Sequence, residues 1–300
     1  EMGFDGVLIS DWAAIEEMIP HGYCADRKEA AIRAIRAGVD IDMMTGIYSE
    51  QLAKLVKEGT IPEALVDEAC LRILTLKNKL GLFENPFKDA DEAKEKTVIR
   101  SEKHRALAKK AAAESFVLLK NEDNFLPLDK SKLHTIGVIG PNADSRKALV
   151  GNYEGTASRY ITVLEGIEDY VGDDVKVYYS EACDLWKDRT SGLAQADDRI
   201  SEAKAVCEVS DVIIAVMGLD SSIEGEQGDA GNEFASGDKK DLLFPGLQRE
   251  VLEVAYSSGK PVILVSMTGS AMALEWEDAH CKAILQAWYP GAAGGKAVAE

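Results

Sequence analysis

An aspartate and a tryptophan follow directly on a buried-strand pattern near the beginning of this sequence. The apolar run of residues 7–10 leads into Asp11 and Trp12. In parallel α/β proteins the carboxyl ends of strands face the ligand crevice, so this run places a carboxylate where chemistry is usually done. Trp12 adds a flat apolar face beside the carboxylate, and this pairing suits a sugar. The residues alone equally allow Asp11 to cap the next helix, which is a common role for aspartate at a strand-to-helix turn.

Further polar and sulfur-containing groups lie close to this motif in the sequence. Glu16 and Glu17 come shortly after it, and the simplest interpretation is a solvated helix face. Adjacent helical residues point in different directions, so at most one of the two faces Asp11. A second apolar run at 39–44 ends in Asp-Met-Met, which places Met44 at another carboxyl end. Met44 therefore either borders the site or belongs to the core.

Residues 218–245 form a long segment without a regular pattern, and they are rich in acids. Several carboxylates lie here, among them Asp220, Glu224, Glu226, Asp229 and Glu233, and no Lys or Arg occurs before Lys239. A loop of this length in a compact domain is usually functional or disordered. Crowded acids raise the pKa of at least one of them, as a general acid near neutral pH requires. A solvated acidic loop is the alternative, whereas calcium binding lacks the Asp-x-Asp-x-Asp-Gly spacing of an EF-hand.

Composition excludes several classes of function. The net charge of −18 argues against nucleic acid, whose binding requires clustered Lys and Arg. No apolar run of about 18 residues is present, so we expect no membrane span. The five cysteines are scattered, without Cys-x-x-Cys spacing, and we expect buried thiols rather than disulfides or zinc ligands. A chain that opens on such a strand motif is expected to be a fragment, which leaves the compartment open among periplasm, exterior and cytoplasm.

The elements around these residues predict an α/β protein with two domains. Strand, helix and strand fit into about forty residues at the beginning, the size of a parallel βα repeat. Later come a helix over 49–57 and a long helix that Thr60 caps and Gly81 ends. An exposed linker is expected over 84–100, between a first domain at 1–83 and a second at 101–300. Continuous apolar strands in the second domain predict a mainly parallel sheet covered on both faces, a three-layer sandwich.

The sequence resembles glycoside hydrolase family 3, in particular its bacterial β-glucosidases, with some similarity to its β-xylosidases. The resemblance covers nearly the whole chain. It rests on motifs that occur in the family's order: Gly3-Phe-Asp-Gly-Val-Leu-Ile-Ser-Asp-Trp12, Ala37-Gly-Val-Asp-Ile-Asp-Met-Met44, Leu80-Gly-Leu-Phe-Glu-Asn-Pro86, Glu114-Ser-Phe-Val-Leu-Leu-Lys-Asn121, Leu126-Pro-Leu, Gly140-Pro-Asn-Ala, Gly151-Asn-Tyr, Phe244-Pro-Gly-Leu-Gln248 and Ala287-Trp-Tyr-Pro-Gly291. The resemblance implies the C-terminal part of a (β/α)8-type barrel followed by an αβα sandwich.

The resemblance also implies retaining hydrolysis of terminal β-linked glucosyl or related residues, with no metal or organic cofactor. Asp11 matches the nucleophile, Trp12 an aromatic of the sugar subsite, and Met44 a strand end near that pocket. Glu226 best matches the acid/base, Glu17 is the main alternative candidate, and Glu233 is the third candidate. Glu224, in the same acidic run, is expected near the substrate together with Glu233. An Arg that commonly follows the acidic run is replaced here by Ala230.

Two hypotheses from different classes follow. One is a β-glucosidase-like hydrolase that acts on β-glucosides and oligosaccharides, the fragment alone being inactive because about six barrel strands are expected to be missing. The other is a noncatalytic carbohydrate-binding or scaffold protein of the same fold. The residues leave glucoside against xyloside preference and association into a homo-oligomer open.

Overall fold

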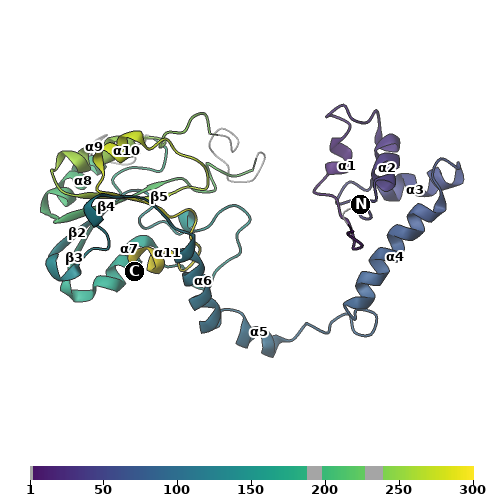
Figure 1. Ribbon diagram of the computed structural model, residues 1–300, viewed down its shortest axis with the longest axis horizontal. Helices are drawn as coiled ribbons and strands as arrows, with labels where there is room; N and C mark the ends of the chain where they lie inside the picture. Colours follow the sequence, from purple (N-terminus) through teal and green to yellow (C-terminus); the bar gives the residue numbers. More distant parts are fainter. Residues whose placement is uncertain (1–2, 188–197, 227–238) are drawn as a thin grey trace. The chain divides into compact units, whose positions relative to one another are not determined.

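The computed structural model describes residues 3–187, 198–226 and 239–300. The chain divides into two compact units, Glu1–Glu95 and Lys96–Glu300. The first unit has one buried apolar cluster and the second unit has two, one on each face of its sheet. Figure 1 shows the elements of each unit, and the two units are described separately below.

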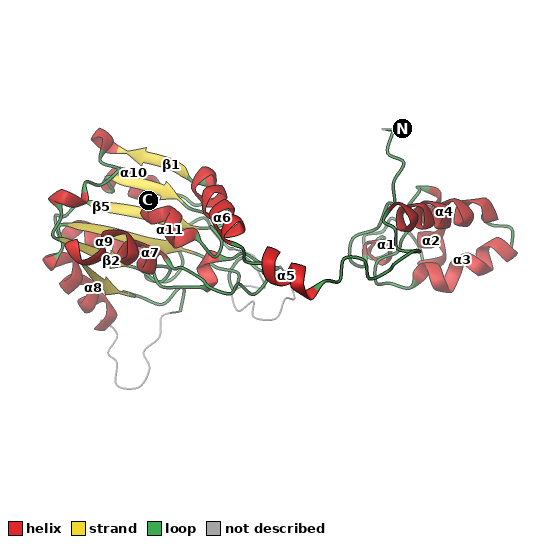
Figure 2. Cartoon of the chain, turned by 90° about the horizontal axis from the view of Figure 1, so that it is seen from below, coloured by secondary structure: helices red, strands yellow, loops and turns green. Residues whose placement is uncertain are grey.

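A six-stranded sheet forms the centre of the second unit (Figure 2). The strand order is β1-β6-β5-β4-β2-β3, and every neighbouring pair is parallel except β1 with β6. The expected mainly parallel sheet is therefore confirmed, with an antiparallel strand at one edge. The strands are β1 (Val117–Asn121), β2 (Thr135–Ile139), β3 (Lys176–Ser180), β4 (Val212–Gly218), β5 (Val262–Met267) and β6 (Ala283–Gln286).

Helices cover both faces of this sheet (Figure 1). Along β4, alternate side chains enter different cores: Ile214 joins one cluster and Ile213 the other. Because successive side chains of a strand point to opposite faces, a strand buried on both sides is apolar throughout. The helices of this unit are α6 (Glu102–Ser115), α7 (Val163–Val171), α8 (Asp198–Val209), α9 (Gln248–Ser257), α10 (Glu275–His280) and α11 (Gly294–Ala299). The 3-10 turns are η1 (Glu122–Asn124), η2 (Lys130–Lys132), η3 (Lys147–Leu149) and η4 (Gly172–Asp174).

Close backbone contacts make two glycines of this unit irreplaceable. A Cβ on Gly218, at the end of β4, would lie 1.9 Å from the main-chain oxygen of Met267 in β5. A Cβ on Gly166 in α7 would lie 2.1 Å from the main-chain oxygen of Gly295 in α11. The two helices therefore pack backbone to backbone at this point, which only glycine permits.

The first unit contains α1 (Ala14–Glu17), α2 (Arg27–Arg36), α3 (Ile47–Lys57) and α4 (Glu63–Lys79). The two expected strands pair in parallel through a single bridge between Ile9 and Ile41. Helix α4 begins at Glu63, directly after Pro62, and no side chain caps it, so the predicted capping role of Thr60 is wrong. Proline supplies the helical φ angle at this boundary without a cap.

The segment expected as a linker is partly helical. Helix α5 (Glu92–Val98) lies within it, and every residue from 83 to 100 is exposed. The run of Ala, Glu and Lys over 92–96 has high helix propensity, which the sequence interpretation did not weigh.

The five cysteines are all free thiols, and four of them are buried as expected. Cys70, on α4, is exposed. Within the described part of the chain, no helix is long and apolar enough to cross a membrane.

Candidate active site

Asp11 stands at the carboxyl end of the first of the two paired segments. The amide of Ser10 donates to the main-chain oxygen of Ile41 over 3.0 Å, and the amide of Ala13 donates to Met43 over 3.3 Å. The Ser10 hydroxyl accepts the amide of Met43 at 2.9 Å and donates to the main-chain oxygen of Asp11 at 3.0 Å. These bonds fix the backbone on both sides of Asp11 against the neighbouring segment.

The Asp11 carboxylate is exposed and does not cap a helix. It accepts the amide of Trp12 at 2.7 Å, whereas α1 begins at Ala14 without any side-chain cap. The alternative that Asp11 is a helix cap is therefore wrong. Trp12 is 65% exposed, so its indole is accessible.

The backbone turns sharply after both paired segments. Ala13 follows the first with φ of 54°, and Met44 ends the second with φ of 78°. Left-handed conformations are uncommon for residues with a Cβ, and such strain concentrates at functional sites. Met44 is more than half exposed, so the expectation that it belongs to the core is wrong, and its role beside the site stays a prediction.

An ion pair with a buried carboxylate connects these two segments to α4. The Asp40 carboxylate accepts the amide of Leu8 at 2.9 Å and the Arg72 guanidinium at 2.8 to 2.9 Å. The Asp40 side chain is 1% exposed. Arg72 on α4 thus holds together the two segments that end at Asp11 and Met44, a connection that the sequence interpretation did not foresee.

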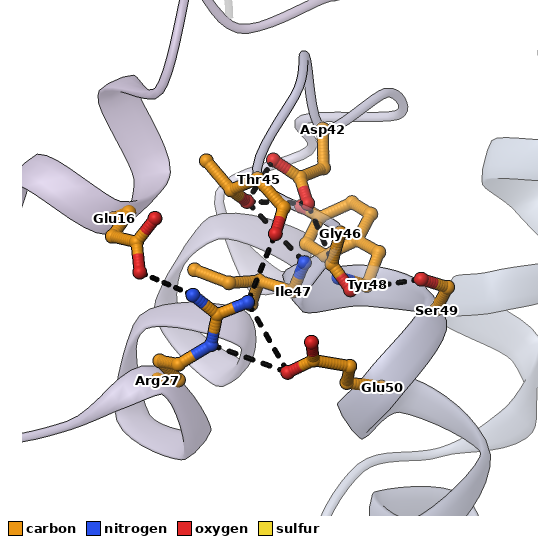
Figure 3. Close-up of polar contacts among 9 residues, drawn as sticks. All are labelled: Glu16, Arg27, Asp42, Thr45, Gly46, Ile47, Tyr48, Ser49 and Glu50. Atoms are coloured by element: carbon orange, nitrogen blue, oxygen red, sulfur yellow. Dashed lines mark hydrogen bonds and ion pairs between the residues drawn. The ribbon is translucent and has the colours of Figure 1, made fainter.

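Figure 3 shows a second polar network, around Arg27 of α2. Its guanidinium pairs with Glu16 of α1, donates to the main-chain oxygen of Thr45 at 2.9 Å, and contacts Glu50 of α3 at 3.1 Å. The Thr45 hydroxyl in turn donates to Asp42 at 2.6 Å. Arg27 therefore connects the loop after the second segment to three helices.

The two neighbouring glutamates of α1 differ in their partners. Glu16 is occupied by Arg27, whereas Glu17 is exposed and makes no side-chain hydrogen bond or ion pair within the described residues. If one of this pair acts chemically, Glu17 is the available group.

The acidic run in the second unit lies beyond the carboxyl end of β4. Glu224 accepts the amide of Gly269, which follows β5, at 2.8 Å, and the hydroxyl of Tyr289, which follows β6. Burial and the hydrogen bond to Glu224 raise the pKa of Tyr289, so its phenol stays protonated and donates. Residues beyond three neighbouring strands therefore fix Glu224 at the carboxyl edge of the sheet, where ligands bind in open α/β sheets.

Glu226, two residues further on, is exposed and accepts the hydroxyl of Tyr153. Tyr153 is exposed and has φ of 59° in the loop after β2. Glu233 lies outside the described residues. The sequence interpretation quoted the segments that contain Tyr153 and Tyr289 but gave these tyrosines no role.

The fold and these positions define a class: an α/β chain of two units, in which acidic side chains stand beyond the carboxyl ends of parallel strands. Comparison with known families makes the assignment specific. Residues 1–76 match the Glycosyl hydrolase family 3 N terminal domain, and residues 116–300 match the Glycosyl hydrolase family 3 C-terminal domain. The chain belongs to glycoside hydrolase family 3.

Individual relatives agree with this assignment. The chain is 35% identical to a periplasmic β-glucosidase of Salmonella typhimurium over its whole length, and it covers 40% of that protein. It is also 35% identical to a β-xylosidase of Formosa agariphila and covers 41% of it. A β-glucosidase from Listeria innocua, solved in complex with isofagomine, superposes with a TM-score of 0.85 at 32% identity, over 99% of this chain and 39% of the other. The chain thus spans about 40% of the length of these relatives.

Proposed function

We propose that this chain carries the nucleophile and the general acid/base of a retaining β-glycosidase that releases terminal β-linked glucosyl residues from β-glucosides and oligosaccharides. The observation that carries the proposal is the Asp11–Trp12 pair, an accessible carboxylate and an accessible indole fixed at a strand end. Family membership supports it, because relatives that the chain matches are β-glucosidases and β-xylosidases.

In the proposed reaction, the Asp11 carboxylate attacks the anomeric carbon while the acid/base protonates the departing glycosidic oxygen. The carbon–oxygen bond breaks, and a glycosyl ester forms on Asp11. The acid/base then takes a proton from water, whose oxygen displaces Asp11 and restores the enzyme. The two carboxyl groups must approach to about 5–5.5 Å for this chemistry.

We propose Glu226 as the acid/base, ahead of Glu17 and Glu233. Its exposed carboxylate and its position beyond β4 support this role. Glu224 is held by Gly269 and Tyr289, which suits a group that positions the loop or a substrate hydroxyl. Trp12 and Met44 would line the sugar subsite.

We further propose a domain division into the C-terminal part of the barrel at 1–83, a linker at 84–100 and the sandwich at 101–300. The isolated chain is expected to be inactive because a (β/α)8 barrel closes its site with loops from eight strands. Measurable hydrolysis of an aryl β-glucoside by the purified 300-residue chain would contradict this part of the proposal.

The nucleophile is tested by trapping the full-length protein with a 2-deoxy-2-fluoro-β-glucoside and mapping the labelled peptide by mass spectrometry. We expect the label on Asp11 and no label in the Asp11→Asn variant. A folded protein that binds glucosides but forms no adduct, and hydrolyses none, would instead be a noncatalytic carbohydrate-binding protein.

The acid/base is tested with single Gln variants of Glu226, Glu17 and Glu233, and Glu224→Gln is the matched control in the same loop. General acid catalysis contributes about 10²–10⁴-fold, so loss of the acid/base should slow substrates with poor leaving groups by that factor. A dinitrophenyl glucoside, whose leaving group needs no proton, should still glycosylate Asp11, and added azide should restore turnover. The proposal predicts this pattern for Glu226→Gln alone, and its appearance in another variant moves the role there.

A further inference from the structure

A basic groove lies on the second unit, at the beginning of α6 and beside the loop that follows Tyr153. Its volume is about 830 Å³, within the range of small-molecule sites. Its charged lining comprises five cations and two acids: Arg100, Arg105, Lys109, Arg159, Lys296, Glu102 and Glu300. The lining thus carries a local excess of positive charge in a chain whose net charge is −18. We call it the α6 groove.

Three of the cations have no acidic partner in the described part of the chain. Lys109 pairs with Glu300 at 2.6 Å, and Arg159 pairs with Glu165. The three others, Arg100, Arg105 and Lys296, are exposed and form no ion pair with any described residue. Arg100 is moreover held with φ of 64°, directly before the residue that caps α6. Three cations that line the groove are therefore not neutralised by any described acid.

The rest of the lining favours a small polar ligand over a protein surface. Thr156 and Ser158 contribute hydroxyls that have no hydrogen-bond partner within the described residues. The floor is made of small apolar side chains, mainly alanines of α6 and of the segment before α11. His104 is the one aromatic ring among the lining residues that the structure describes, so a protein partner would find no Tyr or Trp anchor there.

We propose that the α6 groove binds an anionic saccharide, a short chain of sugar units that carry carboxylates. Arginine forks bind carboxylates bidentately, lysine adds a point charge, and the two hydroxyls and the alanine floor suit the hydroxyl groups and apolar faces of sugar rings. The saccharide part of this inference rests on the proposed function, whereas the anionic part rests on the charges alone. The groove is lined by residues other than Asp11, Glu224 and Glu226.

The test is calorimetric titration of the full-length protein with trigalacturonate, and with maltotriose as a neutral saccharide of equal length. The perturbing variant is Arg100→Gln/Arg105→Gln/Lys296→Gln. The matched control, Lys103→Gln/Lys176→Gln/Lys204→Gln, removes the same charge from exposed lysines outside the groove that have no ion pair with described residues. We expect trigalacturonate to bind, and its affinity to fall at least tenfold in the groove variant only. We expect no comparable binding of maltotriose.

The expected size follows from exposed ion pairs, each of which changes affinity by about two- to fivefold at moderate salt. Binding should also weaken as the salt concentration rises from 50 to 500 mM, because exposed charges are screened. Equal affinity in the groove variant and its control would overturn the proposal. So would absence of trigalacturonate binding to the full-length protein.

Two further probes separate this site from other anion sites. Displacement of trigalacturonate by millimolar inorganic sulfate would show an unspecific anion site and overturn the saccharide assignment. Tighter binding of a hexaglutamate peptide would do the same in favour of a protein partner. Hydrolysis of an aryl β-glucoside is measured in parallel, so that loss of that activity contradicts the proposed function while loss of trigalacturonate binding contradicts this inference.

Discussion

The ion pair between Asp40 and Arg72 gives the sharpest prediction, because it supports the segments that carry Asp11 and Met44. Replacing Arg72 by Met keeps most of the apolar stem and removes the charge. It leaves the Asp40 carboxylate, which is 1% exposed, with the Leu8 amide at 2.9 Å as its one hydrogen-bond partner among the described residues.

Breaking a buried ion pair from one side costs about 3–5 kcal/mol. The Arg72 side chain is 32% exposed, so water can enter where the guanidinium was, and we expect about 2–3 kcal/mol. Asp40→Asn should cost less, because its amide oxygen can still accept the Leu8 amide. The double variant should therefore be less destabilised than the sum of the two single variants, by about 1 kcal/mol or more.

The assay is native-state hydrogen exchange of the full-length protein, read on peptides that contain Leu8 and Ser10. Exchange gives the local free energy of opening, which this pair should raise. Lys77→Met, an exposed position on the same helix, is the matched control and should leave exchange unchanged. Additivity of the two single variants within about 0.5 kcal/mol would refute the reasoning, because it would mean that the two side chains do not interact.

Two more predictions concern the sandwich and the thiols. Gly218→Ala should abolish a stable fold or lower the free energy of unfolding by more than about 4 kcal/mol, because its Cβ would overlap the main chain of Met267. Gly259, with φ of 72°, has no atom within 4 Å of such a Cβ, so Gly259→Ala should lower that free energy by only about 1–2 kcal/mol. Thermal unfolding measures both losses. Equal losses in the two variants would contradict this. Iodoacetamide at pH 8 should label only Cys70 in the native protein, because burial raises the pKa of three other thiols far above that pH and the exposed thiol alone is accessible. The three values are about 12 for Cys183, about 11 for Cys207 and about 12 for Cys281. Mass spectrometry should show all five labelled in urea, and native labelling of a buried thiol would show local opening instead.

Apolar patterning predicted much of the fold. Six strands are predicted by the apolar runs at 116–119, 135–139, 175–179, 211–217, 261–267 and 283–287. The strand at 135–139 has these bounds, and the other five differ by one or two residues at an end. Strands covered on both faces are uniformly apolar, so their sequence signal is strong. Helix α7 was not predicted, because Gly166 lowers the local helix propensity. That glycine is required by its close approach to Gly295 of α11, which is a property of the packed state.

The candidate site, too, was predictable from the sequence only in part. The sequence by itself determined that Asp11 and Trp12 follow a strand and that acids crowd the segment after β4, because strand ends and charge are local properties. Only the tertiary structure decided that Asp11 does not cap α1, that Arg72 supports Asp40, and that Tyr289 holds Glu224. The last two contacts join residues 32 and 65 positions apart. Such contacts depend on which helix packs on which segment and on the order of strands in the sheet, and no local pattern encodes that order.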